Sequence, residues 1–254
     1  MTLPPHLLTN NLTTKYLAYN LSGCIAVLCA VACLAACAPA QSQNQLLTKE
    51  ERSDGFVPLF NGKNLKGWHS YLRDNANEMW QVDSGSIMLK AGGGGDLTTN
   101  REFTNYIFRF EWKISAGGNS GIIYKVNESP QYKATYLSGI EYQVLDNEKH
   151  KDGALRTHRA SSAYDLLAPT DSANPQPNQW HQGEIIVNGT KISHSLDGKK
   201  VVEFDLTSND FLEKLAKSKF AKWQGFAKSP TGRIALQDHG DRVWYRNLRI
   251  KKIK

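Results

Sequence analysis

A period of two in hydrophobicity runs from Phe56 towards the C-terminus and limits the fold of this 254-residue chain more than any other feature. In the segment Ile107–Ile114, Phe108, Phe110 and Trp112 fall on one face of an extended strand, and charged side chains fall on the other. Such alternation is typical of a sheet that buries one face. It predicts strands rather than helices for most of the chain.

Turn dipeptides divide one alternating region into antiparallel strands. Between residues 180 and 206, Asn188-Gly189 and Asp197-Gly198 separate three extended segments. Both dipeptides readily adopt the positive φ angles that tight hairpin turns require. The region is therefore predicted to form a three-stranded meander.

One segment alone, Asp210–Ala216, has a helical pattern, with Asp210 as the expected N-cap and Glu213 completing a box-like start. Strands do not alternate with helices, and there is no internal repeat. Many short strands with frequent turn signals predict an all-β, two-sheet antiparallel sandwich with one short helix. Residues 55–254 contain no linker and are expected to form one domain, with Ala168–Asn178 as a long surface loop.

The first 37 residues differ in composition and are expected to be a lipoprotein signal peptide. The run Leu21–Ala38 is uncharged and apolar, and positions 34–37 read LAAC, which resembles the bacterial lipobox. Cys37 is the expected lipidation site, and residues 38–54 are interpreted as a polar tether. An uncleaved signal anchor is the alternative.

Lipidation would place the domain in the bacterial cell envelope, held to a membrane by its N-terminal lipid. Ala38 carries no acidic retention signal, which favours the outer membrane over the inner one by resemblance to other lipoproteins. The remaining cysteines, Cys24, Cys29 and Cys33, also lie in the leader. The domain that follows therefore has no cysteine for a disulfide framework, a thiolate zinc site or a catalytic thiol.

Charge and motifs exclude several classes of function. The formal net charge is +7, but the basic residues are spread along the chain rather than gathered in a stripe, so no nucleic-acid partner is expected. The glycine runs at 92–95 and 117–121 lack the strand–loop–helix context of a phosphate cradle, so no nucleotide or organic cofactor is expected. No G-x-S-x-G motif supports a serine nucleophile.

The richest candidate site lies in the segment Glu141–Asp152. Glu141 and Gln143 share one face of a predicted strand, and Asp146 and His150 follow in the loop at its end. Carboxylates and an imidazole so placed can bind a divalent cation or transfer protons. The alternative for Asp146 is turn formation, because aspartate commonly accepts hydrogen bonds from its own turn backbone.

A second candidate group, Gln237, Asp238 and His239, lies between the segments Gly232–Leu236 and Val243–Ile250. These two segments are predicted to be a final strand pair, with the group in the loop that joins them. Gln237 and His239 have the same parity, so both can face one groove. The alternative is a hairpin turn that contains an incidental histidine.

Five ordered motifs then give a resemblance to a known family. They are FVPLFNGKNLKGW at 56–68, GGNSGIIY at 117–124, GIEYQVLDNEKHKD at 139–152, YDLLAP at 164–169 and GRIALQDHGDRVWYRNLRI at 232–250. Together they resemble the 3-keto-disaccharide hydrolase domain family over about residues 56–252. This sequence departs from the family pattern at two positions. Ser195 stands where an aromatic residue is common, and His181 stands where an asparagine often follows the tryptophan.

The resemblance implies a concanavalin A-like jelly-roll sandwich that acts on carbohydrate. Family members are similar to enzymes that cleave glycosides already oxidised to a ketone at C3, in several cases with a divalent metal. The implied chemistry is abstraction of the C2 proton, β-elimination of the C1 substituent and subsequent hydration. It also implies a partner that produces the ketone, a 3-dehydrogenating oxidoreductase.

The resemblance also implies roles for the candidate residues. Glu141 and His239 are the leading catalytic residues, one of them the base, and Asp146 and His150 assist them or bind metal together with Glu141. Further residues are expected to contact substrate or orient it: Arg109, Glu111, Asn119, Tyr124, Gln143, Gln237 and Asp238. Two alternatives to an enzyme stay open, a non-catalytic carbohydrate-binding module and a structural surface lipoprotein with a decayed site.

Overall fold

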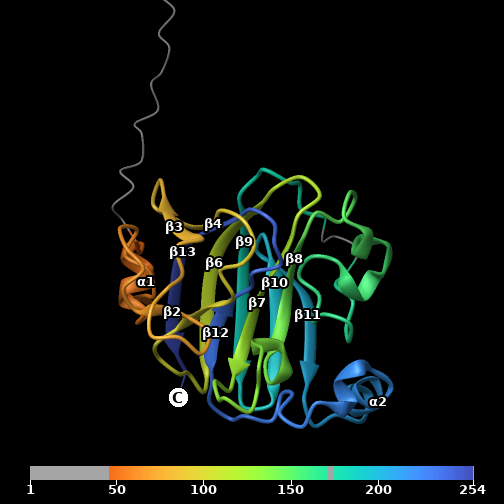
Figure 1. Cartoon of the computed structure of the whole chain (residues 1–254). Helices are drawn as coiled ribbons and strands as arrows, with labels where there is room; N and C mark the ends of the chain where they lie inside the picture. Colours follow the sequence, from red (N-terminus) through yellow and green to blue (C-terminus); the bar gives the residue numbers. More distant parts are fainter. Residues whose placement is uncertain (1–45, 171–173, 254) are drawn as a thin grey trace, which may run out of the picture. The chain divides into compact units, whose positions relative to one another are not determined.

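The computed structural model describes residues 46–170 and 174–253 (Figure 1). The predicted signal peptide and Cys37 lie outside these residues. Within the described part of the chain, no helix combines the length and the apolar character that a membrane crossing requires.

Two antiparallel sheets form the predicted sandwich (Figure 1). The larger, eight-stranded sheet has the order β11 (Lys199–Asp205), β10 (Lys191–Leu196), β9 (His181–Asn188), β6 (Tyr106–Ile114), β13 (Val243–Lys252), β4 (Ser86–Leu89) and β3 (Trp80–Asp83), with β1 (Val57–Pro58) paired to β13. The smaller, five-stranded sheet has the order β2 (Trp68–Ser70), β5 (Leu97–Thr99), β12 (Arg233–Leu236), β7 (Asn119–Val126) and β8 (Ile140–Leu145). The expected all-β, two-sheet antiparallel fold is confirmed, including the meander β9–β10–β11.

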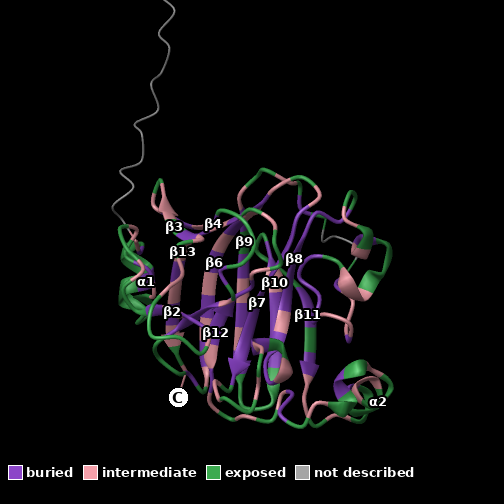
Figure 2. Ribbon diagram, viewed as in Figure 1, coloured by how far each residue is buried: buried purple, intermediate pink, exposed green. Residues whose placement is uncertain are grey.

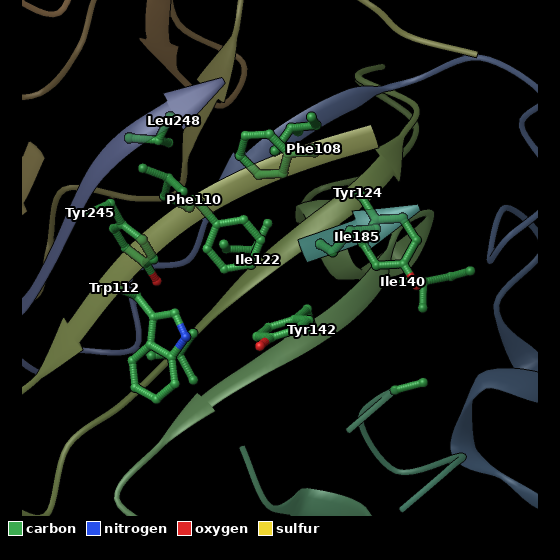
Figure 3. Packing of buried hydrophobic residues seen from close by; sticks show 14 of the residues in the cluster. Phe108, Phe110, Trp112, Ile122, Tyr124, Ile140, Tyr142, Ile185, Tyr245 and Leu248 are labelled. Carbon is green, nitrogen blue, oxygen red and sulfur yellow. The ribbon is translucent and has the colours of Figure 1, made fainter. Parts of the chain in front are cut away.

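The hydrophobic core fills the space between the sheets. Strand β6 alternates regularly between buried and half-buried residues, and its buried side chains Phe108, Phe110 and Trp112 face the smaller sheet (Figures 2 and 3). The Phe110 ring meets the ring of Tyr142 edge to face, with 5.2 Å between centroids. Because Tyr142 points inward from β8, its neighbours Glu141 and Gln143 point away from the larger sheet.

The Gln237–Asp241 segment crosses from one sheet to the other, which corrects the predicted final strand pair. Strand β12 pairs with β5 and β7 in the smaller sheet, whereas β13 pairs with β4 and β6 in the larger one. The local alternation identified both strands, but each strand pairs with strands that are far away in the sequence. The crossing places the Gln237–His239 loop beside the start of β7, where Asn119 N donates to the Asp241 carboxylate at 2.9 Å.

Two α-helices lie within the described residues, α1 (Lys49–Ser53) and α2 (Asn209–Lys217), rather than the single helix expected. The cap of α2 is Ser208, not Asp210, because the Ser208 hydroxyl accepts from Phe211 N while its backbone is still extended. Short 3₁₀ turns complete the chain: η1 (Thr135–Leu137), η2 (Lys151–Ala154), η3 (Arg156–His158) and η4 (Lys219–Lys222).

Helix α1 lies in the segment that was expected to be a polar tether. Thr48 and Glu51 form a reciprocal capping box, so residues close together in the sequence determine where the helix begins. The Glu51 carboxylate also accepts from Arg249 Nε of β13 at 2.5 Å. The described end of the expected tether is therefore bound to the larger sheet.

Candidate active site

A pocket of about 320 Å³ lies on the outer face of the smaller sheet and contains five of the predicted site residues. Glu141 and Gln143 come from β8, Asn119 from the start of β7, and Gln237 and His239 from the segment after β12. The lining is completed by Tyr136, Tyr164, Lys219, Phe220 and Trp223. The predicted parity of Gln237 and His239 is confirmed, because both side chains reach the same pocket.

Glu141 lines this pocket in a position that disfavours its charged form. Burial, reinforced by the negative charge of Asp96, raises the pKa of Glu141 to about 8, whereas Lys219 and a hydrogen bond from Gln237 oppose the shift. At neutral pH the protonated form of this carboxyl group therefore predominates. It can donate a proton, which an ordinary surface glutamate cannot do at this pH.

Gly121 makes room for the Glu141 side chain. A Cβ atom at position 121 would lie 2.4 Å from Glu141 Oε1 and 2.9 Å from its Cδ, far inside van der Waals contact. The structure thus explains why position 121 in the GGNSGIIY motif is glycine. Gly121 lies on β7, which pairs with β8, the strand that carries Glu141. The carboxyl group lies against bare backbone on one side and faces the pocket on the other.

His239 is exposed at the rim and is held by contacts from two other segments. Its Nε2 lies 3.4 Å from Asn119 Nδ2, and its ring meets the His150 ring edge to face at 6.2 Å. The electrostatic influence of His239 reaches Asp96, where it opposes the rise in that group's pKa.

Two acidic residues fasten the loops around His239. Asp96 accepts hydrogen bonds from Asp238 N and the Thr135 hydroxyl, and burial raises the pKa of Asp96. Asp238 Oδ2 in turn accepts from Gly94 N at 2.7 Å and Gly95 N at 2.9 Å. Asp238, predicted to contact substrate, instead joins the glycine-rich loop to the β12–β13 crossing. Asp96 was missed because nothing in the sequence near β5 marks it.

Asn119 Oδ1 and Gln237 Oε1 are buried acceptors that have no hydrogen-bond partner among the described residues. Buried polar atoms in proteins are nearly always paired, so an unpaired acceptor requires an explanation. Both residues line the pocket. Hydrogen-bond donors of a bound ligand would pair with both oxygens.

Aromatic rings and one lysine from segments outside the strands complete the lining of the pocket. Lys219 Nζ lies 4.5 Å from the Tyr164 ring centroid and 3.5 Å from Asp165 Oδ2. The Tyr136 and Trp223 rings lie against each other with centroids 5.5 Å apart. These residues lie in connecting segments without periodicity, so strand patterns could not find them. Only Tyr164 lies in one of the recognised motifs.

Arg109 and Glu111, expected to orient substrate, do not reach this pocket. They belong to β6 of the larger sheet, and their parity points them away from the core rather than towards the smaller sheet. Arg109 Nε donates to Glu184 at 2.8 Å, and Glu111 accepts from Arg246 at 2.7 Å. They stabilise the outer face of the larger sheet.

Tyr124 is likewise not placed to contact substrate. It is fully buried between the sheets (Figure 3). Its hydroxyl lies 2.8 Å from Nε2 of His194 on β10. Burial raises the pKa of Tyr124 well above its ordinary range and lowers that of His194 to about 4. This pair is a neutral polar contact within the core.

Asp146 forms the turn that was its alternative interpretation. Its Oδ2 accepts from Gly117 N at 2.7 Å, its Oδ1 accepts from Glu148 N and Lys149 N, and these bonds lower its pKa. A carboxylate engaged in this way does not fit the predicted metal set of Glu141, Asp146 and His150. Across residues 46–170 and 174–253, no group of three or more His, Cys, Asp or Glu side chains is arranged to hold a metal ion.

Comparison with known proteins supports the family suggested by the motifs. A family described as the 3-keto-alpha-glucoside-1,2-lyase-like domain matches residues 55–251. A 3-keto-disaccharide hydrolase of Bacteroides thetaiotaomicron is 33% identical over 229 residues, which are 78% of this chain and 79% of that protein.

Solved structures agree with this relationship. One candidate glycosyl hydrolase from Parabacteroides distasonis superposes with a TM-score of 0.76 at 31% identity, covering 82% of this chain and 98% of that one. A second from the same organism has a TM-score of 0.62 at 27% identity and covers 78% and 99% of the two chains.

Proposed function

Because the chain belongs to the family of 3-keto-α-glucoside-1,2-lyase-like domains, we propose that it cleaves glycosides whose sugar carries a ketone at C3. The observation that carries the proposal is that Glu141 and His239 line one pocket together with the amides of Asn119, Gln143 and Gln237. The pocket thus combines two groups that can transfer protons with neutral side chains suited to sugar hydroxyls.

We assign the base to His239 and the acid to Glu141. A C3 ketone acidifies the C2–H bond, and the neutral imidazole takes this proton while the bonding electrons form the enolate. The enolate then reforms the C3 carbonyl, a C1–C2 double bond forms, and the C1–O bond breaks. Glu141, protonated at neutral pH, gives its proton to the departing oxygen.

The other pocket residues hold the substrate and balance the charge of the enolate. Gln143 Oε1 accepts from Val144 N at 3.0 Å, which leaves its amide N–H groups for the ligand. Lys219 brings a positive charge to the pocket wall. Water that later adds across the C1–C2 double bond converts the product to the free 3-keto sugar, so the net reaction is hydrolysis.

The test is to incubate the purified protein with a 3-keto-disaccharide and with the same disaccharide before oxidation. Release of the second sugar from the oxidised substrate alone is the expected result, and EDTA treatment reports whether an added metal takes part. Binding without release would identify a carbohydrate-binding module instead. If the protein neither binds nor cleaves the oxidised disaccharide, only a structural role is left.

We also propose that the protein is a lipid-anchored envelope protein whose substrate is supplied by an oxidoreductase that forms the C3 ketone. The support is the LAAC sequence that ends at Cys37, together with a pocket suited to a sugar that must first be oxidised. Metabolic labelling with a fatty acid should mark the wild-type protein but not Cys37→Ser. Equal labelling of both proteins would contradict the anchor.

A further inference from the structure

Trp223 separates the active-site pocket from a second hollow. The second hollow has a volume of about 230 Å³ and is lined by Gln131, Tyr132, Leu137, Trp223 and Gln224. Trp223 is shared by the linings of both spaces. A ligand longer than one sugar can therefore occupy the active-site pocket and continue past this ring.

The Trp223 ring is held in place by its neighbours. Its centroid lies 4.9 Å from that of Phe220, with the planes at 66°, and 5.5 Å from that of Tyr136. The following Gly225 permits a close approach, because a Cβ there would lie 2.4 Å from the Tyr132 ring. Tyr136 remains 44% exposed, so part of its ring is open to a ligand in the active-site pocket that it lines.

The chemical character of the second hollow suits a neutral, hydroxyl-rich group. All five lining residues are uncharged. Gln131 and Gln224 are exposed and offer amide donors and acceptors, while Trp223 and Tyr132 offer ring faces. Flat aromatic surface with a few neutral polar groups is the usual composition of a pocket for an uncharged ligand.

We propose that the second hollow binds the leaving-group sugar of the substrate, with Trp223 as the platform between the two sugar rings. This inference rests on the proposed function, since it places the oxidised ring beside Glu141 and His239. It makes Trp223 and Gln224 determinants of specificity for disaccharides over glycosides with a small leaving group.

The experiment compares kcat/KM for a 3-keto-disaccharide with kcat/KM for the methyl 3-keto-glucoside of the same sugar. The wild type should prefer the disaccharide. Trp223→Ala should reduce the ratio of the two values by about tenfold or more, and Gln224→Ala by about three- to fivefold, as expected for loss of one hydrogen bond. Gln81→Ala, which removes an exposed glutamine from β3 of the other sheet, is the matched control.

Circular dichroism and thermal unfolding show whether the Trp223→Ala variant keeps its fold. Gln224 is exposed, so the Gln224→Ala variant tests the inference even if Trp223→Ala fails to fold. An unchanged ratio in the Gln224→Ala variant and in a folded Trp223→Ala variant would overturn the subsite. Absence of turnover with both substrates in the wild type would instead overturn the proposed function, and this inference with it. The two failures are thus distinguishable.

Discussion

The carboxyl group of Glu141 occupies the space that a side chain at Gly121 would need. An ideal Cβ on Gly121 lies only 2.4 Å from Glu141 Oε1. The two residues lie on neighbouring strands, one at the centre of the GGNSGIIY motif and the other in GIEYQVLDNEKHKD. The arrangement links a backbone feature of β7 to the position of a proposed catalytic group on β8.

Gly121→Ala should therefore impair catalysis more than folding. The new methyl group would push the flexible end of Glu141 out of place, and kcat/KM should fall by about tenfold or more, because small displacements of catalytic groups are costly. Stability should change little, since the displaced atoms are the end of a side chain.

Gly183→Ala provides the contrast for this prediction. On β9, the added Cβ would lie 2.1 Å from the Phe110 ring inside the core. Overpacking of this kind should lower stability by about 1–3 kcal/mol. Equal losses of thermal stability in the two variants would contradict the account of Gly121.

The pH dependence of kcat/KM should show an alkaline limb set by Glu141. The pKa of this residue is raised to about 8, and the proposed acid acts only in its protonated form. Activity should therefore fall about tenfold for each pH unit above 8. Steady-state assays from pH 5 to 10 measure this, and activity that rises through pH 8 would show that Glu141 acts as the base.

Glu141 should also make the protein less stable at high pH. A folded-state pKa above the unfolded value means that the folded protein holds this proton more tightly, so the contribution to stability is complete below about pH 4.5 and is lost as the pH rises through 8. At pH 9 the partly buried carboxylate should cost about 1–3 kcal/mol.

Glu141→Gln carries no such charge, so its Tm should exceed that of the wild type at pH 9. The difference should shrink towards pH 5, where both side chains are neutral for most of the time. Thermal unfolding at the two pH values measures the effect. A Tm difference that does not vary with pH would contradict the raised pKa.

Asp238→Ala should release the loop that carries His239. The substitution removes acceptors for Gly94 N, Gly95 N and Gly240 N, and it should cost about 1–3 kcal/mol of stability and about tenfold in kcat. Asp83→Ala is the control, because it removes the acceptor of the Trp244 indole on the other sheet. If both variants lose activity equally, Asp238 does not position His239.

Much of the architecture could be predicted because alternation is a local property. Parity along one strand correctly placed Glu141 and Gln143 together and opposite Tyr142. It does not say which sheet a strand joins, so it could not show that Arg109 and Glu111, which were expected to orient substrate, lie on the other sheet. It also does not distinguish a core-facing residue from a pocket-facing one, which misplaced Tyr124.

The missed residues are those that only the tertiary fold brings to the site. Asp96, Lys219 and Trp223 reach the pocket or its loops from segments far apart in the sequence, and none carries a repeating pattern. Asp146 shows the opposite case. Its turn interpretation followed from aspartate chemistry alone and agrees with its three backbone hydrogen bonds.

The most direct test of the proposed mechanism is hydrogen exchange at C2 of a 3-keto-glucoside in D₂O, followed by NMR with Glu141→Gln and His239→Ala. With the base intact and the acid removed, Glu141→Gln should exchange the C2 hydrogen for deuterium while releasing the leaving group at least tenfold more slowly than the wild type. His239→Ala should neither exchange the C2 hydrogen nor release the leaving group. Exchange by His239→Ala together with its absence in Glu141→Gln would contradict the assignment and make Glu141 the base.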